Sequence, residues 1–556
     1  MTTLKPQPTY EMTRQEKRFI GLHLVVAIFA LSVGSLFGPL QAFEWSGLDL
    51  YQFLEPIGLG DYYKGLTAHG VLNALVWTTF FITGFLTLTT IVGLRRPLRY
   101  PKLNQVGFWM MVVGLVMAAI PILAGWASVL YTFYPPLEAS WAFYLGLTLV
   151  VVGSWIEGYG FFFTFIAWRK ENPDVRTPFI TFGGLITMAM WQVATLGIAV
   201  EILTMLLPYS LGLTDGTDPQ LGRTFFWFTG HPLVYFWLLP AYISWYGMLP
   251  KQAGGKLFSD SLARLAFWLF LLLSIPVGFH HQFVDPGIPT GWKAIHASLT
   301  YGVAFPSMLT LFTVVASLEY AATRRGGTGL FGWIRALPWG DASVTAQLLA
   351  GILFMFGGIG GITNASYNVN LVIHNTAWIP GHFHLTVATA VTLSFMGISY
   401  WLVPHLTGKP LWKPKWALAQ AWLWFVGMII FSNAMHVLGL LGAPRRTALG
   451  TAPYVPDEWN GHLLRVSIGG AILLVSVIMY VVTMIRTAAQ KERVAVGEEV
   501  QIPIAESLRD PQLTPLWLDT WKPWIIGTVL LIVLAYGPQL WEQITNASFS
   551  SPGFSP

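Results

Sequence analysis

Long apolar stretches are the feature that most constrains how this chain can fold. Thirteen stretches have about the 20 residues that an α-helix needs to cross a bilayer. They lie at 19–42, 65–93, 104–133, 139–168, 178–212, 224–249, 262–285, 294–323, 343–366, 378–407, 416–442, 463–485 and 524–543. Only 10% of the residues are charged, against about 25% in soluble proteins. The sequence therefore predicts an all-α, polytopic membrane helix bundle with about thirteen transmembrane helices.

The positions of the basic residues predict the orientation of this bundle. If the N-terminus lies inside, all but six of the 31 Lys and Arg residues fall on the inner side. The six outer ones are Lys64, Arg223, Lys293, Arg445, Arg446 and Arg465. Because basic residues concentrate in inner loops, we predict that the N-terminus is inside and the C-terminus outside.

We expect one transmembrane domain over 1–556, with the membrane bundle at 19–545 and one long charged inner linker at 487–521. The polar start at 1–18 does not resemble a removable signal peptide. The chain has no Cys, so any disulfide, iron–sulfur cluster or thiolate copper site must reside on a partner.

Two histidines stand near the start of one apolar stretch, in Trp378-Ile379-Pro380-Gly381-His382-Phe383-His384. Residues at i and i+2 of a helix project about 200° apart, so one helix could hold two different cofactors here. Histidine is a common ligand of haem iron and copper, and an ionisable group at membrane depth suggests a functional site. Either histidine alone could equally be a core residue with satisfied hydrogen bonds.

Six of the twelve histidines share one estimated depth, in the outer part of the predicted bundle. They are His69, His231, His280, His281, His382 and His384. Unrelated core histidines have no reason to share a depth, so this layer predicts a metal centre. Of the others, His374 lies close to the predicted site, and the rest have a structural interpretation.

A second pattern follows His231. Tyr235, Tyr242 and Tyr246 fall on the same helical stripe as this histidine. The stripe is either aromatic packing or a proton path from the inner face to the histidine layer, because tyrosine hydroxyls in lipid need polar partners.

Three motifs together carry a family resemblance. They are Gly230-His231-Pro232-Leu233-Val234 followed by Tyr-Phe-Trp-Leu-Leu-Pro-Ala-Tyr, Val277-Gly278-Phe279-His280-His281-Gln282-Phe283, and His374-Asn375-Thr376-Ala377-Trp378 leading into Gly381-His382-Phe383-His384. They resemble subunit I of haem-copper oxygen reductases. Gly-His-Pro-Leu-Val-Tyr and the thirteen segments are similar to the B-type branch. A-type relatives have Glu where Leu233 stands, and that Glu ends a second proton channel, which this chain should lack.

The resemblance implies specific ligands. His69 and His384 are expected to be the axial ligands of a low-spin haem b, and His382 that of a high-spin haem of a-type or o-type. The residues expected to bind the copper called CuB are His231, His280 and His281. Arg445 and Arg446 are expected to bind haem propionates, since an arginine fork suits carboxylates.

The resemblance also assigns the proton chemistry. Tyr235 matches a tyrosine that is covalently joined to the copper-binding histidine and supplies an electron and a proton. Ser307 and Thr310 match hydroxyls that join Tyr242 and Tyr246 in a single proton-input path.

Two departures from the family pattern affect protons. Asn370 stands where relatives have Asp near the high-spin haem, and Gly153 stands where they have Ser in the input path. The second departure affects one link of the path, which a water can replace where the small residue leaves room.

The function that follows is a terminal respiratory oxidase subunit I that reduces O2 to water and couples this to proton translocation in a prokaryotic cytoplasmic membrane. Expected partners are an oxidase subunit II with a dinuclear copper site, a small single-helix subunit, and cytochrome c or another small redox protein as donor; a quinol donor stays open. A nitric oxide reductase and a non-catalytic haem-binding membrane protein are the alternatives. The absence of an acidic residue on the Tyr235 stripe argues against the reductase.

Overall fold

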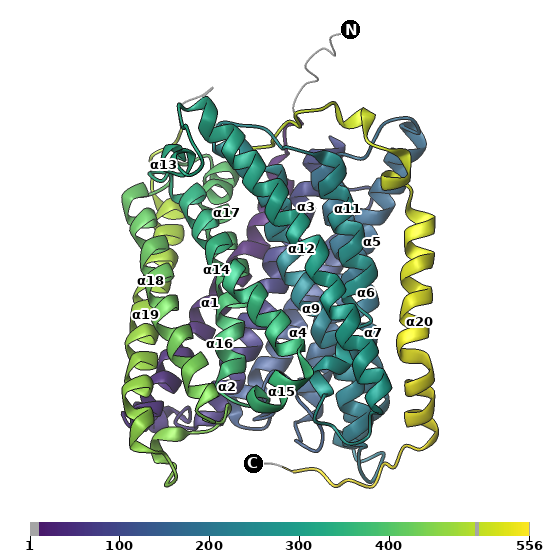
Figure 1. The fold of residues 1–556 in the computed structure, drawn as a ribbon, viewed down its shortest axis with the longest axis vertical. Helices are drawn as coiled ribbons and strands as arrows, with labels where there is room; N and C mark the ends of the chain where they lie inside the picture. Colours follow the sequence, from purple (N-terminus) through teal and green to yellow (C-terminus); the bar gives the residue numbers. More distant parts are fainter. Residues whose placement is uncertain (1–9, 495–499, 555–556) are drawn as a thin grey trace.

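The computed structural model describes residues 10–494 and 500–554, and in this part of the chain the regular structure is helical, with isolated β-bridges only. The helices run side by side along the long axis of the molecule (Figure 1). The described chain starts at one end of this bundle and finishes at the opposite end. The predicted all-α bundle is confirmed.

Eleven helical segments of the described chain are long and apolar enough to cross a membrane. They are Arg14–Trp45 (α1), Tyr62–Leu94 (α2 to α3), Pro101–Ala124 (α4), Trp141–Glu171 (α5), Phe179–Ser210 (α6 to α8), Thr290–Arg324 (α12), Ala342–Ala365 (α14), Trp378–Thr407 (α16 to α17), Pro414–Leu440 (α18), Asp457–Ala489 (η7 and α19) and Trp521–Thr545 (α20). Two predicted spans are not among them, and they correspond to α9 (Pro219–Gly247) and α11 (Asp260–Ser274). The first is interrupted by polar residues, and the second has only 15 residues.

The predicted helix at 104–133 is too long, because α4 ends at Ala124. Gly125 follows in a left-handed conformation (φ +81°), which is a common way for a helix to end. The apolar residues beyond it form a loop and are buried in the protein, as Val129 and Phe133 show. Their hydrophobicity therefore reflects protein packing and not contact with lipid.

The predicted helix at 262–285 is also too long, because α11 ends at Ser274. Pro276 follows two residues later; it lacks the N–H that the next helical hydrogen bond would need. The next residues form a short 3-10 turn, η4 (Gly278–Gln282). Both histidines of this region therefore lie on a turn and not on a helix.

Three predicted spans contain a π-helical turn, which the sequence pattern did not indicate. These turns are η2 (Val71–Trp77), η3 (Ile202–Leu206) and η5 (Thr386–Val391). Two of them begin two residues after His69 and His384. Such turns are frequent at functional sites because they change the direction of neighbouring side chains.

Helices α4 and α5 approach each other through glycines. A Cβ at Gly153 would lie 2.6 Å from the carbonyl oxygen of Gly107, so only glycine fits, as is common between membrane helices. Neighbouring backbone fills the space beside Gly153, so the small residue leaves no room at this position for a side chain in place of the missing serine.

The described parts of the predicted linker pack against the bundle, and its residues 495–499 lie outside the described chain. Ala505 N–H donates to the Gly247 carbonyl at the end of α9 (2.7 Å). The fully buried Arg264 of α11 binds Asp519, just before α20 (3.1 Å). These contacts attach α20 to the rest of the bundle at one end (Figure 1).

Candidate metal centre and cofactor cavities

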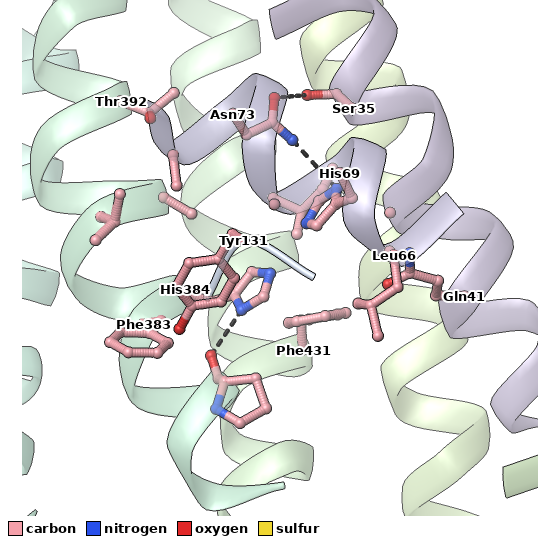
Figure 2. A pocket seen from close by; sticks show the side chains of 18 of the residues that line it. Ser35, Gln41, Leu66, His69, Asn73, Tyr131, Phe383, His384, Thr392 and Phe431 are labelled. Atoms are coloured by element: carbon pink, nitrogen blue, oxygen red, sulfur yellow. Dashed lines mark hydrogen bonds between the residues drawn. The ribbon is translucent and has the colours of Figure 1, made fainter. Parts of the chain in front are cut away.

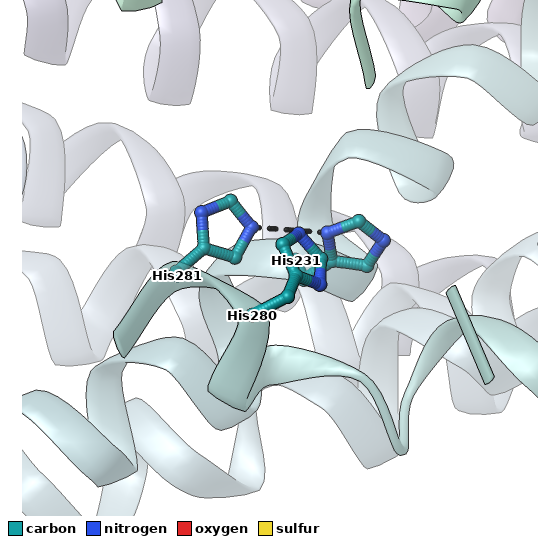
Figure 3. Close-up of side chains that lie close together, drawn as sticks. All are labelled: His231, His280 and His281. Atoms are coloured by element: carbon teal, nitrogen blue, oxygen red, sulfur yellow. Dashed lines mark hydrogen bonds between the residues drawn. The ribbon is translucent and has the colours of Figure 1, made fainter. Parts of the chain in front are cut away.

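Three histidines from two elements form a candidate metal centre. His231 comes from α9, and His280 and His281 come from the turn η4; their potential ligand atoms all lie within 4.8 Å of one another. Nδ1 of His231 lies 3.1 Å from Nε2 of His281, and Figure 3 shows the three rings gathered together. Three imidazoles suit copper among other divalent metals, so the residues fit the expected ion.

Neighbouring side chains fix two of these rings. The Thr300 hydroxyl donates to the His296 carbonyl (2.7 Å) and lies 2.9 Å from His280 Nδ1. Since its one hydrogen is used, it accepts from His280 Nδ1–H and leaves Nε2 free for a metal. His281 lies face to face on Trp227, with ring centroids 3.7 Å apart and planes 2° from parallel. Thr300 could not be found from the sequence, because it stands 20 residues from His280 on another helix.

A second pair of histidines forms a different arrangement. The rings of His69 and His384 have centroids 6.3 Å apart and planes 14° from parallel. If one metal ion lies between two imidazoles, their ring centroids are separated by two metal–nitrogen bonds of about 2.0–2.1 Å and half the width of each ring, which is about 6 Å in all. Nδ1 of His69 lies 2.9 Å from the Gly34 carbonyl, and Nδ1 of His384 lies 2.6 Å from the Pro380 carbonyl. Each Nδ1–H can therefore donate to backbone and leave Nε2 for one shared ion.

These two rings face a largely apolar cavity of about 270 Å³ (Figure 2). Arg445 and Arg446, which the resemblance assigns to haem propionates, also line it. Gly38 is required beside it, because a Cβ there would lie 2.8 Å from Cε1 of His69. A flat apolar group with acidic substituents fits this lining.

A second cavity, of about 910 Å³, lies on the other side of α16 (Trp378–Leu385). It is lined by His382 and by the three histidines of the metal centre, whereas His384 lines the first cavity; Phe383 between them lines both. The predicted division of two histidines between two faces of one helix is confirmed. His382 packs against α14 where Gly360 leaves space, since a Cβ there would lie 2.9 Å from its Nδ1.

The predicted tyrosine stripe borders this second cavity. Tyr235 and Tyr242 line it, and the ring of Tyr235 lies 5.3 Å from that of His231. The Tyr246 hydroxyl donates to Thr310 Oγ1 (2.8 Å). Tyr242 and Ser307 both line the second cavity, and the buried Tyr242 hydroxyl has no hydrogen-bond partner among the described residues. In the predicted proton path, Tyr246 and Thr310 are therefore linked by a hydrogen bond, whereas Tyr242 and Ser307 only line the same cavity.

The two arginines differ in their contacts. Arg445 donates to the side-chain carbonyl of Asn375 (2.8 Å). Burial, with the neighbouring Arg446 guanidinium, lowers the pKa of Arg445 to about 10, so it stays charged at neutral pH. Arg446 has a buried Nη2 without a hydrogen-bond partner among the described residues, and it lies over the ring of Tyr134 (5.5 Å). Two close positive charges, one with an unused donor, favour an anionic group between them.

Asn370 has a defined role beside the second cavity. Its amide nitrogen donates to the Asn364 side-chain oxygen (2.8 Å), and its own oxygen accepts from His374 Nδ1 (3.2 Å). Burial lowers the pKa of His374 to about 4, so this ring is neutral. Asn370 and His374 both line the cavity, as predicted for His374.

Two cavities on opposite sides of one membrane helix, one bordered by a facing pair of imidazoles and the other by one imidazole and a three-histidine cluster, define a class of protein. It is a polytopic membrane protein that binds haem beside a second metal ion.

Comparisons with known proteins make this class specific. Residues 18–472 match the family described as cytochrome c and quinol oxidase polypeptide I. The chain is 47% identical over 532 residues to cytochrome c oxidase subunit 1 of Thermus thermophilus, covering 94% of each. It is 27% identical over 501 residues to cytochrome c oxidase polypeptide 1 of Halobacterium salinarum, covering 83% of this chain and 78% of the relative. A cryo-EM structure of a heme-copper terminal oxidase dimer matches with a TM-score of 0.92 and 42% identity, covering 98% of this chain and 95% of that one.

The chain therefore belongs to the cytochrome c and quinol oxidase polypeptide I family. It is an oxidoreductase, the subunit I of a haem-copper terminal oxidase, and it works with other oxidase subunits in a membrane. The predicted activity is confirmed, and the alternatives of a nitric oxide reductase and a non-catalytic haem protein are not supported.

Proposed function

We propose that the chain is a B-type oxidase subunit that reduces O2 with four electrons and four protons to two waters and couples this reaction to proton translocation. The observation that carries the proposal is the second cavity, where His382, the three-histidine cluster and Tyr235 border one space. Among the described residues, Glu319 is the only carboxylate that lines this cavity, and it is not part of the cluster. A site of imidazoles and tyrosine suits copper better than non-haem iron.

Each metal ligand has a proposed role. His69 and His384 hold a low-spin haem, His382 holds a high-spin haem, and His231, His280 and His281 hold copper. When bound, the high-spin haem and the copper supply the place where oxygen binds and is reduced. Arg445 and Arg446 bind the propionates, and Tyr235 supplies an electron and a proton from beside His231.

The sizes of the two cavities support different haems. The first, of about 270 Å³, suits a haem b without a long substituent. The second, of about 910 Å³, continues past the histidines between α12 and α14 to apolar residues such as Trp333 and Leu337. This continuation favours a high-spin haem of a-type or o-type, whose hydrocarbon tail needs an apolar channel.

We infer that all thirteen helical segments cross the membrane as one domain over 1–556, with the N-terminus inside a prokaryotic cytoplasmic membrane. Helices α9 and α11 lie alongside the eleven apolar spans (Figure 1). Because the described chain starts at one end of the bundle and finishes at the other, it should cross the membrane an odd number of times. The distribution of basic residues favours an N-terminus on the inner side.

The partners follow from what the chain lacks. Without Cys, a dinuclear copper entry site must lie on an oxidase subunit II. We propose that this subunit receives electrons from cytochrome c or another small redox protein, and that a small single-helix subunit completes the complex.

The proton path can be tested by removing two hydroxyls. The double variant Tyr246→Phe with Thr310→Val should slow oxygen consumption and proton uptake at least about tenfold, since positioned proton-transfer groups contribute about 10²–10⁴-fold, while both haem spectra stay unchanged. The measurement is turnover and proton uptake in vesicles.

The matched control is Tyr480→Phe with Ser399→Ala. It removes an equally buried tyrosine–hydroxyl pair (2.9 Å) that lines neither cavity, so turnover should stay within about twofold of the parent. Normal turnover with inner proton uptake in the path variant would mean that the tyrosine stripe is only packing.

The role of Gly38 gives a separate prediction. Gly38→Ala should displace the His69 ring and reduce low-spin haem content, because overpacking costs about 1–3 kcal/mol. Gly21→Ala is the control on the same helix, since a Cβ there meets nothing within 4 Å. The haem-to-protein ratio decides: equal ratios in both variants would show that His69 is not held in place by this contact.

A further inference from the structure

The turn that carries two of the proposed copper ligands lies where α11 has ended. Backbone N–H groups beyond a helix end need new partners, and two amides of this turn find them in side chains from elsewhere. Gly278 N–H donates to the Tyr536 hydroxyl (2.9 Å), and Phe279 N–H donates to His296 Nδ1 (3.2 Å).

Both partners connect the turn to α20, the last helix. Tyr536 belongs to α20, and His296 Nε2–H donates to the Ala535 carbonyl of the same helix (3.0 Å). His296 thus bridges α12, the copper-ligand turn and α20, and both of its nitrogens are used. Its tautomer is fixed, because Nδ1 accepts and Nε2 donates.

The fit around the turn is close. A Cβ at Gly278 would lie 2.3 Å from the Tyr536 hydroxyl and 2.4 Å from the Trp227 carbonyl, so glycine is required there. The Tyr536 ring packs on Phe279 (5.0 Å) and on His296 (4.8 Å). In contrast, α20 buries few of its other side chains, and Figure 1 shows it along the outside of the bundle.

We propose that α20 positions the copper-ligand turn through Tyr536 and His296, which act as positioning residues for the copper centre. The inference rests on the proposed assignment of copper to His231, His280 and His281. Both residues accept hydrogen bonds from the backbone directly before His280, so they determine the positions of the His280 and His281 rings relative to His231. Groups that orient metal ligands typically change metal affinity about 10–100-fold when removed.

The test measures copper loss from the purified, fully assembled oxidase to a copper(I) chelator under reducing conditions. Tyr536→Phe and His296→Leu should lose the histidine-bound copper at least about tenfold faster than the parent, with unchanged low-spin haem spectra. His296→Gln should restore much of the retention, because one amide can accept from Phe279 N–H and donate to the Ala535 carbonyl.

Thr528→Val is the matched control. It removes another buried hydroxyl from α20, one that makes no hydrogen bond in the described chain, and should lose copper at the parent rate. If both Tyr536→Phe and His296→Leu lost copper at the parent rate, α20 would be only a packing element and the inference would be overturned. This holds even if the midpoint temperature of unfolding were lower in these variants. His280→Ala serves as the reference without the histidine-bound copper; if it held as much copper as the parent, the copper assignment itself would be wrong, which is a different failure.

Discussion

His280→Ala should remove the copper of this subunit and reduce oxygen consumption more than about 100-fold, while both haem spectra remain. Loss of a group that only orients a ligand costs about 10–100-fold, and loss of a ligand should cost more. The three ligand atoms lie within 4.8 Å of one another, so two remaining imidazoles leave an open coordination position that the protein does not fill. Oxygen-electrode rates and copper content per chain measure the effect.

His462→Ala is the control for this variant. This histidine is partly exposed, lines neither cavity and contacts Arg465 (2.7 Å), so its loss should leave copper and turnover within about twofold of the parent, as for most surface substitutions. Full oxygen consumption in His280→Ala would contradict the assignment of the three-histidine cluster to the reaction.

His384→Ala should remove the low-spin haem and leave copper in place. In the described part of the chain, its ring and that of His69 are the only imidazoles that line the first cavity, and the parallel pair is spaced for one ion between two nitrogens. With one ring lost, a single protein ligand is too little to hold the haem, so the haem is lost and its bis-imidazole spectrum disappears. Electrons should then reach the second cavity more than about 100-fold more slowly, comparable with the loss of a metal ligand.

Reduced-minus-oxidised spectra of the purified variant measure the low-spin haem, and elemental analysis measures its copper. A retained bis-imidazole spectrum would show that His69 and His384 do not share one haem. Loss of copper together with the haem would show that the two cavities are not independent across α16.

The sequence predicted the parts of the site that depend on local spacing. His382 and His384, two residues apart on one helix, had to face opposite sides, and the two cavities lie accordingly. Tyr235 follows His231 by one helical turn, and its ring lies close to that histidine. These relations need only helical geometry, which holds in any bundle.

Other features depended on contacts between distant segments. Thr300 orients His280, and Tyr536 holds Gly278 from more than 250 residues away; neither contact leaves a pattern in the sequence. The ends of α4 and α11 were missed because the apolar runs continue into loops that are buried in protein. In a membrane protein, hydrophobicity marks burial in protein as well as exposure to lipid. Gly125 and Pro276 were the only local signals of those ends.

The most direct test of the account is a count of metals in the purified wild-type complex, compared with His280→Ala. The expected result is iron equal to two haems per chain, and one more copper per chain in the wild type than in the variant, with the remaining copper on the partner subunit. Iron in excess of two haems, with no difference in copper between the two complexes, would contradict a haem-copper site built from His231, His280 and His281.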